Sequence, residues 1–373
     1  MNFNFEEALE SLGADATFMI ASEARPPADY LFNTLLPERN EPTYTVKSAD
    51  MTVRATMAGL VGMDSPYPPS GVVEISTFLE EVAKIANHAA LSEASLRRLQ
   101  AIMQQMMVSG SLDNDYLVGE ALNFLNKVII QAHLDRAEWM RAQALVTGQI
   151  DWTFNNKNLV VSYGVPTANF LTNRTSNDTW DGSTSKFWTD IRLLNEALRY
   201  NVRAYIVHPD TLWAILNNDA NKAEVLRQDA FTNGTSQVTL RRLIGDNERP
   251  SQDNRDTVTL IAYGGEGEII DLSNPGQTVT VPFMPSGKIL AVGNNTRSGY
   301  RVGEGSTSDP IEDKALGYTH IAPTTEGGGR PGRWAQLYVP ENLPMQLHGR
   351  GVSNTLPVIE APKKIAVASS NLS

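Results

Sequence analysis

The amino-acid sequence predicts an α+β fold organised around one unusually long helix. Residues 115–147 contain no proline, and their apolar residues recur at helical spacing. Residues 43–75 instead alternate apolar with polar residues, which is typical of strands. Residues 166–330 carry helical and strand patterns in the order helix, strand, helix, which favours a small α/β layer.

The long helix is expected to span residues 115–147 and to end at Gly148, a residue typical of helix ends. At 1.5 Å per residue it is about 50 Å long, several times the usual length. A membrane span is excluded by its charged residues, and an irregular heptad weakens the coiled-coil interpretation. The interpretation that remains is a helix that serves as a structural spine along one domain. The apolar stripe consists of Val118, Leu122, Leu125, Ile129 and Ala132. The charged residues are Glu120, Lys127, Asp135, Arg136, Glu138 and Arg141.

Composition limits the class of protein. The chain has 373 residues, of which 41 % are hydrophobic, enough for two or three domains with substantial cores. Its net charge of −11 argues against a surface built to bind nucleic acid, although not against a protein that encloses it. The absence of cysteine excludes disulfides, thiolate metal sites and a cysteine nucleophile. The acidic N-terminus does not resemble a signal peptide, so we expect folding in a reducing cytoplasm.

Residues 1–42 resemble an extended arm. A short amphipathic helix is expected from Phe5 to Leu12, and prolines at 26, 27, 37 and 42 break the segment that follows. The apolar residues of 29–40, DYLFNTLLPERN, have no obvious local core. They are expected to pack on a partner chain or, equally well, on their own domain.

Residues 43–75 are expected to form a long two-stranded loop. Its apolar tip contains Met57, Leu60, Val61 and Met63. Because an isolated two-stranded ribbon is marginal in water, this loop needs a surface to lie on. The alternative is an ordinary hairpin within a larger sheet.

Further elements follow in order. A helix is expected from Thr77, where Thr77 and Glu80 form a capping box ahead of an apolar face. A second helix is expected between Ser92 and Gly110, and a strand follows the spine near residues 155–166. Later expectations are a helix at 186–200, a strand at 204–207, a helix from Asp210, strands at 258–263, 268–271, 278–281 and 288–292, a glycine-rich loop at 323–333, and strands at 334–339 and 344–347.

Motifs for chemistry are weak throughout. The PSGK at 285–288 lacks the first glycine and the hydroxyl residue of a phosphate loop, and it is expected to be a turn. The five histidines are scattered, and His133 is expected to be a hydrogen-bonded core residue. Asp210 of the HPD at 208–210 is expected to cap a helix. No GxSxG motif nominates a serine, so the sequence offers no catalytic, cofactor-binding or metal-binding residue.

The order of these parts resembles the major capsid protein of tailed bacteriophages. The resemblance rests on DRAEWMRAQALVTGQI at 135–150, SYGVP at 162–166, DIRLLNEAL at 190–198, AYIVHPDTLWAILNN at 204–218, SGKILAV at 286–292 and LPVIEAPKKIAVA at 356–368. It is similar in particular to the lambda-type (gene E) branch of the Hong-Kong-ninety-seven-like capsid fold.

This resemblance implies both a domain plan and a function. The plan is an N-terminal arm (1–42), an extended β-hairpin loop (43–75), a peripheral domain with the spine helix (76–165), an axial domain (166–330) and C-terminal strands returning to the peripheral domain (331–373). The function implied is a structural head protein, not an enzyme. It assembles in the host cytoplasm as pentamers and hexamers into an icosahedral shell around double-stranded DNA, without sequence-specific binding.

Other implications concern contacts and alternatives. The tip residues Met57, Leu60, Val61 and Met63 are expected to contact a neighbouring subunit. Portal, scaffold and decoration proteins are expected partners, whereas a cofactor and a membrane are not. An encapsulin-type compartment shell is the first alternative function, and a soluble α/β enzyme is the remoter one.

One prediction concerns covalent cross-linking, which some relatives achieve through a lysine on the extended loop. This chain has no lysine between Lys47 and Lys84, so the loop tip has no amine nucleophile for an isopeptide bond. Mature particles should therefore run as a single monomer band on a denaturing gel. A ladder of covalent oligomers would contradict this expectation.

Overall fold

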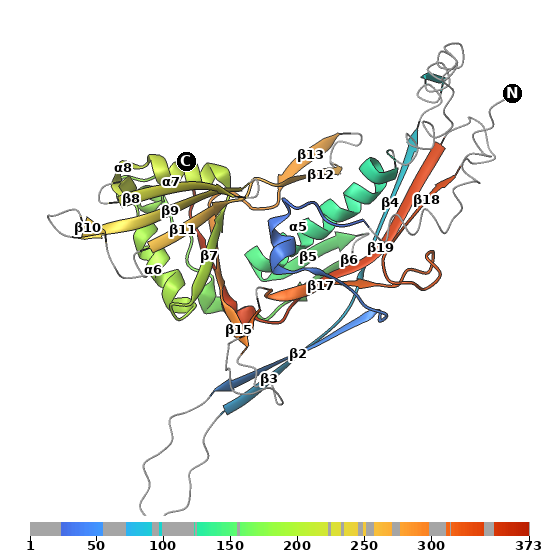
Figure 1. The fold of residues 1–373 in the computed structure, drawn as a ribbon, viewed down its shortest axis with the longest axis horizontal. Helices are drawn as coiled ribbons and strands as arrows, with labels where there is room; N and C mark the ends of the chain where they lie inside the picture. The colour runs from blue at the N-terminus through green and yellow to red at the C-terminus, as the bar shows by residue number, and fades with distance from the viewer. Residues whose placement is uncertain are drawn as a thin grey trace, which may run out of the picture.

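The computed structural model describes residues 24–54, 72–91, 97–98, 123, 125–154, 157–222, 225–232, 235–244, 249–250, 257–270, 277–297, 311–313, 315–338 and 347–372. Two sheets form the body of the chain (Figure 1). A five-stranded sheet carries the long helix α5, and a seven-stranded sheet carries the shorter helices α6, α7 and α8. A two-stranded ribbon projects away from both.

The five-stranded sheet is built around β19, a strand of 13 residues. It pairs antiparallel with β4, β17 and β18, and β1 adds to β17 in parallel. The bounds are β1 (Glu38–Asn40), β4 (Ala83–Leu91), β17 (Gly317–Ala322), β18 (Arg333–Tyr338) and β19 (Leu347–Ile359).

Helix α5 (Gln131–Thr147) lies across this sheet and continues a π-helical turn, Leu125–Ile130. Gly351 of β19 permits the close approach, because a Cβ there would lie only 2.5 Å from Ile129 Cγ2. The helix ends at Gly148, whose left-handed φ of 70° and N–H bond to the Ala144 carbonyl form the C-cap.

The seven-stranded sheet has the order β10-β9-β11-β7-β14-β20, with β8 added to β9. Strands β7 and β11 are parallel, and the connection between them contains α7, α8 and the strands β8, β9 and β10. The bounds are α6 (Phe187–Ala197), β7 (Val202–Val207), α7 (Pro209–Asn217), α8 (Asp219–Lys222), β8 (Val225–Thr232), β9 (Thr235–Ile244), β10 (Arg249–Pro250), β11 (Thr257–Ala262), β14 (Lys288–Gly293) and β20 (Ile365–Ser369).

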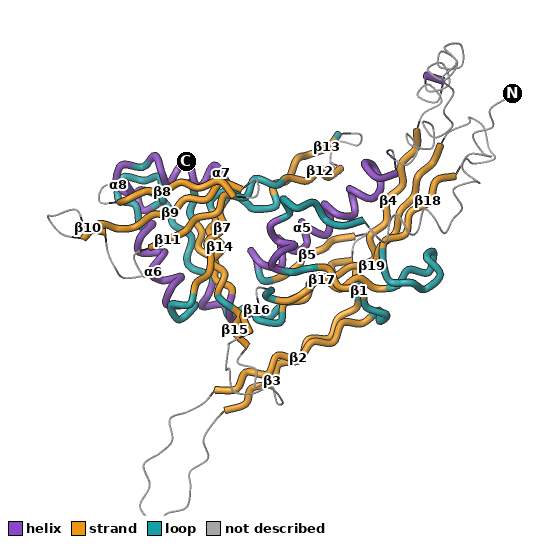
Figure 2. Tube along the Cα trace, in the orientation of Figure 1, coloured by secondary structure: helices purple, strands orange, loops and turns teal. Residues whose placement is uncertain are grey.

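Among the described residues, the other elements are four two-stranded sheets, the short helix α2 (Leu31–Leu35) and three 3-10 turns. The sheets are β2 (Thr45–Arg54) with β3 (Val72–Glu81), β5 (Gln149–Phe154) with β6 (Lys157–Ser162), β12 (Glu266–Ile270) with β13 (Thr278–Pro282), and β15 (Asn295–Arg297) with β16 (Ile311–Asp313). Figure 2 shows two of these sheets, β2–β3 and β12–β13, standing clear of the other strands. The turns are Thr167–Asn169, Ser176–Asp178 and Pro362–Lys364.

The two large sheets share a core. Alternation along β7 sends Tyr205 and Val207 into the cluster beneath α6 and α7, and Ile206 into the opposite cluster. That second cluster also contains Met140 and Leu145 of α5, so one apolar core joins both sheets.

Several sequence predictions are confirmed. The spine helix ends at Gly148, and the described part begins at Leu125; of residues 115–124 only Asn123 is described. Helix α6 lies within the helix expected at 186–200 and buries Phe187, Ile191 and Leu194 on one face. The PSGK segment is a turn before β14, with Gly287 at a φ of 73°. The expected helices at 5–12 and 92–110 lie outside the described residues, apart from Arg97 and Arg98.

The helix expected from Thr77 is wrong. Residues 72–81 and 83–91 are strands β3 and β4, separated by Val82 alone. Val82, Ile85 and Ala89 are spaced as the apolar residues of a helix are. However, β4 pairs with β19 at nine positions, and this pairing outweighs the local preference for a helix. Strands β8 and β9 are not among the predicted elements, although Val238 and Leu240 of β9 lie two residues apart and are both buried, as on one face of a strand.

Two other expectations need correction. His208, not Asp210, caps α7, because its ring Nδ1 accepts from the Asp210 N–H at 3.2 Å and Pro209 occupies the first turn. The C-terminal strands of residues 331–373, expected to return together to the peripheral domain, divide between the two sheets. Strands β18 and β19 belong to the five-stranded sheet, whereas β20 pairs with β14 in the seven-stranded sheet.

Gly148 and Gly164 offer a matched test of the helix end. Both have left-handed φ, but a Cβ at Gly148 would lie 2.8 Å from Phe170 Cζ, whereas Gly164 has nothing within 4 Å. Gly148→Ala should lower the free energy of unfolding by about 2–4 kcal/mol, combining backbone strain with overpacking. Gly164→Ala should lower it by about 1 kcal/mol, through backbone strain alone. Equal losses in chemical denaturation would show that Phe170 does not restrict the site.

Candidate functional site

The described part of the predicted contact site is the ribbon β2–β3. Its tip residues Met57, Leu60, Val61 and Met63 lie outside the described residues. The ribbon is a separate two-stranded sheet and not part of a larger one, as Figure 1 shows. This arrangement agrees with the expected extended loop, although its second strand runs on to Glu81.

The base of the ribbon is held by three contacts. Val46 is fully buried in the main core. The Val82 N–H donates to the Tyr44 carbonyl at 3.1 Å and closes the two strands. His320 of β17 contributes Nε2, which lies 2.8 Å from the Thr43 carbonyl and donates to it. The ribbon therefore leaves the body from a fixed point.

The arm residues 30–40 pack on their own chain. Phe32, Leu35 and Leu36 are buried, and β1 pairs in parallel with β17. Of the two expected alternatives, packing on the chain's own domain is therefore the one that this part of the arm follows. The sequence could not show it, because the surfaces that cover them come from residues more than one hundred positions away.

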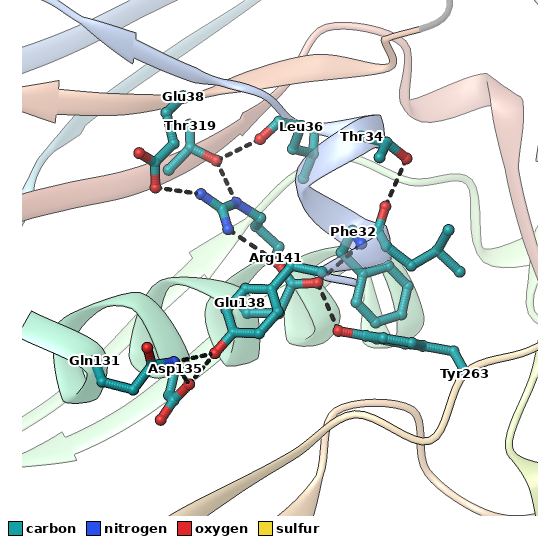
Figure 3. Close-up of polar contacts among 12 residues, drawn as sticks. Phe32, Thr34, Leu36, Glu38, Gln131, Asp135, Glu138, Arg141, Tyr263 and Thr319 are labelled. Carbon is teal, nitrogen blue, oxygen red and sulfur yellow. Dashed lines mark hydrogen bonds and ion pairs between the residues drawn. The ribbon is translucent and has the colours of Figure 1, made fainter. Parts of the chain in front are cut away.

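A buried network of charges fixes the arm to the spine helix (Figure 3). Arg141 of α5 is fully buried and donates three ways: Nη1 to Glu138 Oε2 at 2.9 Å, Nη2 to Glu38 Oε1 at 2.8 Å, and Nε to Thr319 Oγ1 at 2.8 Å. Arg333 of β18 donates to the same Glu38 oxygen. Two glutamates and two arginines balance in charge, which is what burial requires.

Glu138 connects this network to the seven-stranded sheet. Its Oε1 accepts from the Phe32 N–H and from the Tyr263 hydroxyl, each at 2.9 Å. Tyr263 directly follows β11. Burial raises the pKa of the Glu138 carboxyl, and the bonds from Arg141, Tyr263 and Phe32 oppose that rise by stabilising the charged form. One carboxylate therefore bonds the arm, the helix and the second sheet.

A second polar group lies one turn earlier on α5. The Tyr30 hydroxyl donates to Asp135 Oδ1, and Gln131 Nε2 donates to both of them, at 2.7 Å and 2.9 Å. Burial and the neighbouring Asp135 raise the pKa of Tyr30, so its hydroxyl stays protonated as a donor. The arm is thus bonded to α5 at two successive turns.

His133 is a core histidine, as predicted. It is buried between α5 and the sheet, with Nδ1 at 2.8 Å from Ser353 Oγ and Nε2 at 2.9 Å from Asn87 Oδ1. Burial lowers the pKa of His133 to about 4, with a smaller contribution from Arg333. The ring is neutral at pH 7 and acts as a hydrogen-bonding spacer.

The remaining histidines contact other parts of the chain: His208 caps α7, His320 lies at the base of the ribbon, and His88 and His348 contact each other. His88 of β4 and His348 of β19 are far apart in sequence, yet Nε2 and Nδ1 lie 2.7 Å apart on the sheet surface. Within the described ranges, no three His, Asp or Glu side chains gather as metal ligands. In the same part of the chain, no helix has the length and apolar character needed to cross a membrane.

The family comparison decides what these parts belong to. A model of the phage major capsid protein E family matches residues 19–303, well over half of the chain. The chain belongs to the phage major capsid protein E family. A comparison with curated proteins finds no match. This family is a structural class of protein, and the buried network is interpreted as a device that fixes the shape of the subunit.

Several solved structures are similar to this chain. A protein of Escherichia coli CFT073 assigned as a prophage capsid protein matches over 100 % of both chains, with a TM-score of 0.54 and 12 % identity. Satellite phage P4 procapsid matches over 91 % of this chain and 95 % of its own, with a TM-score of 0.42 and 9 % identity. The SrpI encapsulin of Synechococcus elongatus PCC 7942 matches over 99 % and 96 %, with a TM-score of 0.41 and 11 % identity. This chain has the Hong-Kong-ninety-seven-like fold.

The network predicts a large cost for removing Arg141. Arg141→Met leaves Glu138 and Glu38 buried without their main partner and should lower the free energy of unfolding by about 3–5 kcal/mol. Lys84→Met is the matched control, because Lys84 forms an exposed ion pair with Glu326 at 2.8 Å and should cost at most about 1 kcal/mol. Chemical denaturation of both variants measures the difference, and similar losses would contradict a stabilising role for the buried network.

Proposed function

We propose that this chain is the head subunit of a tailed phage, and that it assembles as pentamers and hexamers into an icosahedral shell around double-stranded DNA. The observation that carries the proposal is the family match over residues 19–303. The net charge of −11 suits a container that encloses DNA without binding it tightly. Shell assembly in the host cytoplasm and contacts with portal, scaffold or decoration proteins belong to the same proposal.

We further propose a division of labour within the subunit. The five-stranded sheet and α5 serve as the peripheral domain, and the seven-stranded sheet with α6 and α7 serves as the axial domain. The ribbon β2–β3 is the extended loop, and its tip residues Met57, Leu60, Val61 and Met63 bury against a neighbouring subunit. Support comes from the anchored base of the ribbon and from its pairing as two strands alone among the described residues.

No observation on the described residues favours a second function. An encapsulin-type compartment would share this fold, but the family match is to phage capsid proteins. An enzyme would need a reactive group, and the buried polar side chains around Arg141 instead satisfy one another.

A double variant at the ribbon tip tests the proposal. Leu60→Asp with Val61→Asp should leave a folded subunit with an unchanged melting temperature that forms no shells, because two charges replace the apolar contact. Leu60→Met with Val61→Ile is the matched control and should assemble as the wild type does. Circular dichroism measures folding, and sedimentation velocity with negative-stain microscopy measures assembly.

Two outcomes would count against the proposal. Normal shells from the Asp double variant would refute the role of the tip. Small discrete particles from the wild-type chain under all assembly conditions would refute the shell function itself.

A further inference from the structure

The hairpin β12–β13 carries an apolar face that its own chain covers only in part. The strands pair from Glu266 with Pro282 to Ile270 with Thr278. Because side chains alternate along a strand, Gly267, Val281, Ile269 and Val279 share one face. Figure 1 shows this hairpin standing out from the body beside α5.

The inner half of that face is packed. A Cβ placed on Gly267 would lie 3.0 Å from the buried ring of Phe283 and 3.9 Å from Asp135 Cβ of α5. Val281 opposite Gly267 is also partly buried. The hairpin therefore leans on α5 at its base.

The outer half of the same face is open. Ile269 is 42 % exposed and Val279 is 45 % exposed, and the register places them directly opposite each other. Single exposed apolar residues are ordinary on protein surfaces. Among the exposed large apolar side chains of the described residues, these are the only two that are direct cross-strand partners.

The position of the hairpin indicates which partner would cover it. Figure 1 views the chain along its shortest axis, and the hairpin lies on the rim of that view, opposite the rim from which the ribbon β2–β3 leaves. The two faces seen along the shortest axis are the broad faces of the subunit, and the outline of Figure 1 is its rim. When such subunits tile the proposed shell, the broad faces point inward and outward, so the rim meets other subunits. Contacts that close a ring join two different surfaces of one chain, as opposite rims would provide.

We propose that Ile269 and Val279 form a contact with a neighbouring copy of this chain in the assembled shell. The inference rests on the proposed shell function and adds an assembly site distinct from the ribbon tip. Glu266 and Glu268 on the other face of the hairpin are acidic and exposed. They oppose the approach of DNA phosphates, which favours a protein partner over the enclosed nucleic acid.

A single introduced cysteine tests burial at this site. The chain has no natural cysteine, so Val279→Cys creates one unique thiol. A maleimide should label Val279→Cys at least tenfold more slowly in assembled shells than in dissociated subunits. Thr280→Cys, on the opposite face of the same strand, is the control and should be protected less.

The outcomes separate this inference from the proposed function. Shells in which Val279→Cys reacts as fast as in free subunits would overturn the inference alone. A wild-type chain that never forms multimers would overturn both.

A pair of double variants tests the energetic role of the contact. Ile269→Ser with Val279→Ser should reduce the yield of shells at least tenfold at fixed protein concentration, while circular dichroism of the subunit stays unchanged. Glu268→Ser with Thr280→Ser alters the same two strands on the other face and should assemble at the wild-type yield. Equal shell yields from the two variants would overturn the inference.

Discussion

The architecture depends on a small group of buried charges centred on Arg141. Its guanidinium bonds Glu138 on the same helix, Glu38 of the arm and Thr319 of the central sheet. Glu138 in turn accepts from Tyr263, which directly follows β11 of the second sheet. Burying charges is costly, and a hydrophobic cluster of equal volume would often be as stable. Directional bonds, however, fix position, and four segments distant in sequence must take one arrangement to satisfy them.

This constraint matters because the subunit is an extended object with few ways to hold its shape. The apolar core that contains Met140 and Leu145 also receives Ile206 and Leu290 from the seven-stranded sheet, so the two sheets do not have separate interiors. A shared core resists separation of the sheets but allows sliding, since the hydrophobic effect is non-directional. The hydrogen bonds of the polar network are directional, and they fix the position of one sheet relative to the other. Together they explain how a single chain can present its rims at defined angles.

Local patterns in the sequence predicted part of this fold. The C-terminus of the spine helix at Gly148 and the buried face of α6 follow from glycine geometry and helical periodicity, which act within a few residues. The segment around Ile85 was misassigned as a helix, because its pairing with β19 depends on residues some 260 positions later. The network could not be predicted at all, since Glu38, Arg141 and Arg333 have no pattern that links them before the chain folds. The tip of the ribbon remains a prediction from its composition.

The direct passage from β3 into β4, with Val82 alone between them, has a mechanical consequence. A pull on the ribbon passes directly into β4, which pairs antiparallel with β19 from Ala83 to Leu91. The ladder bonds lie perpendicular to the strands, so the component of the pull along β4 loads all of them together in shear and does not open them one at a time. A joint loaded in shear fails only when the whole row of bonds breaks at once. The ribbon is therefore attached in a way that resists tension along β4.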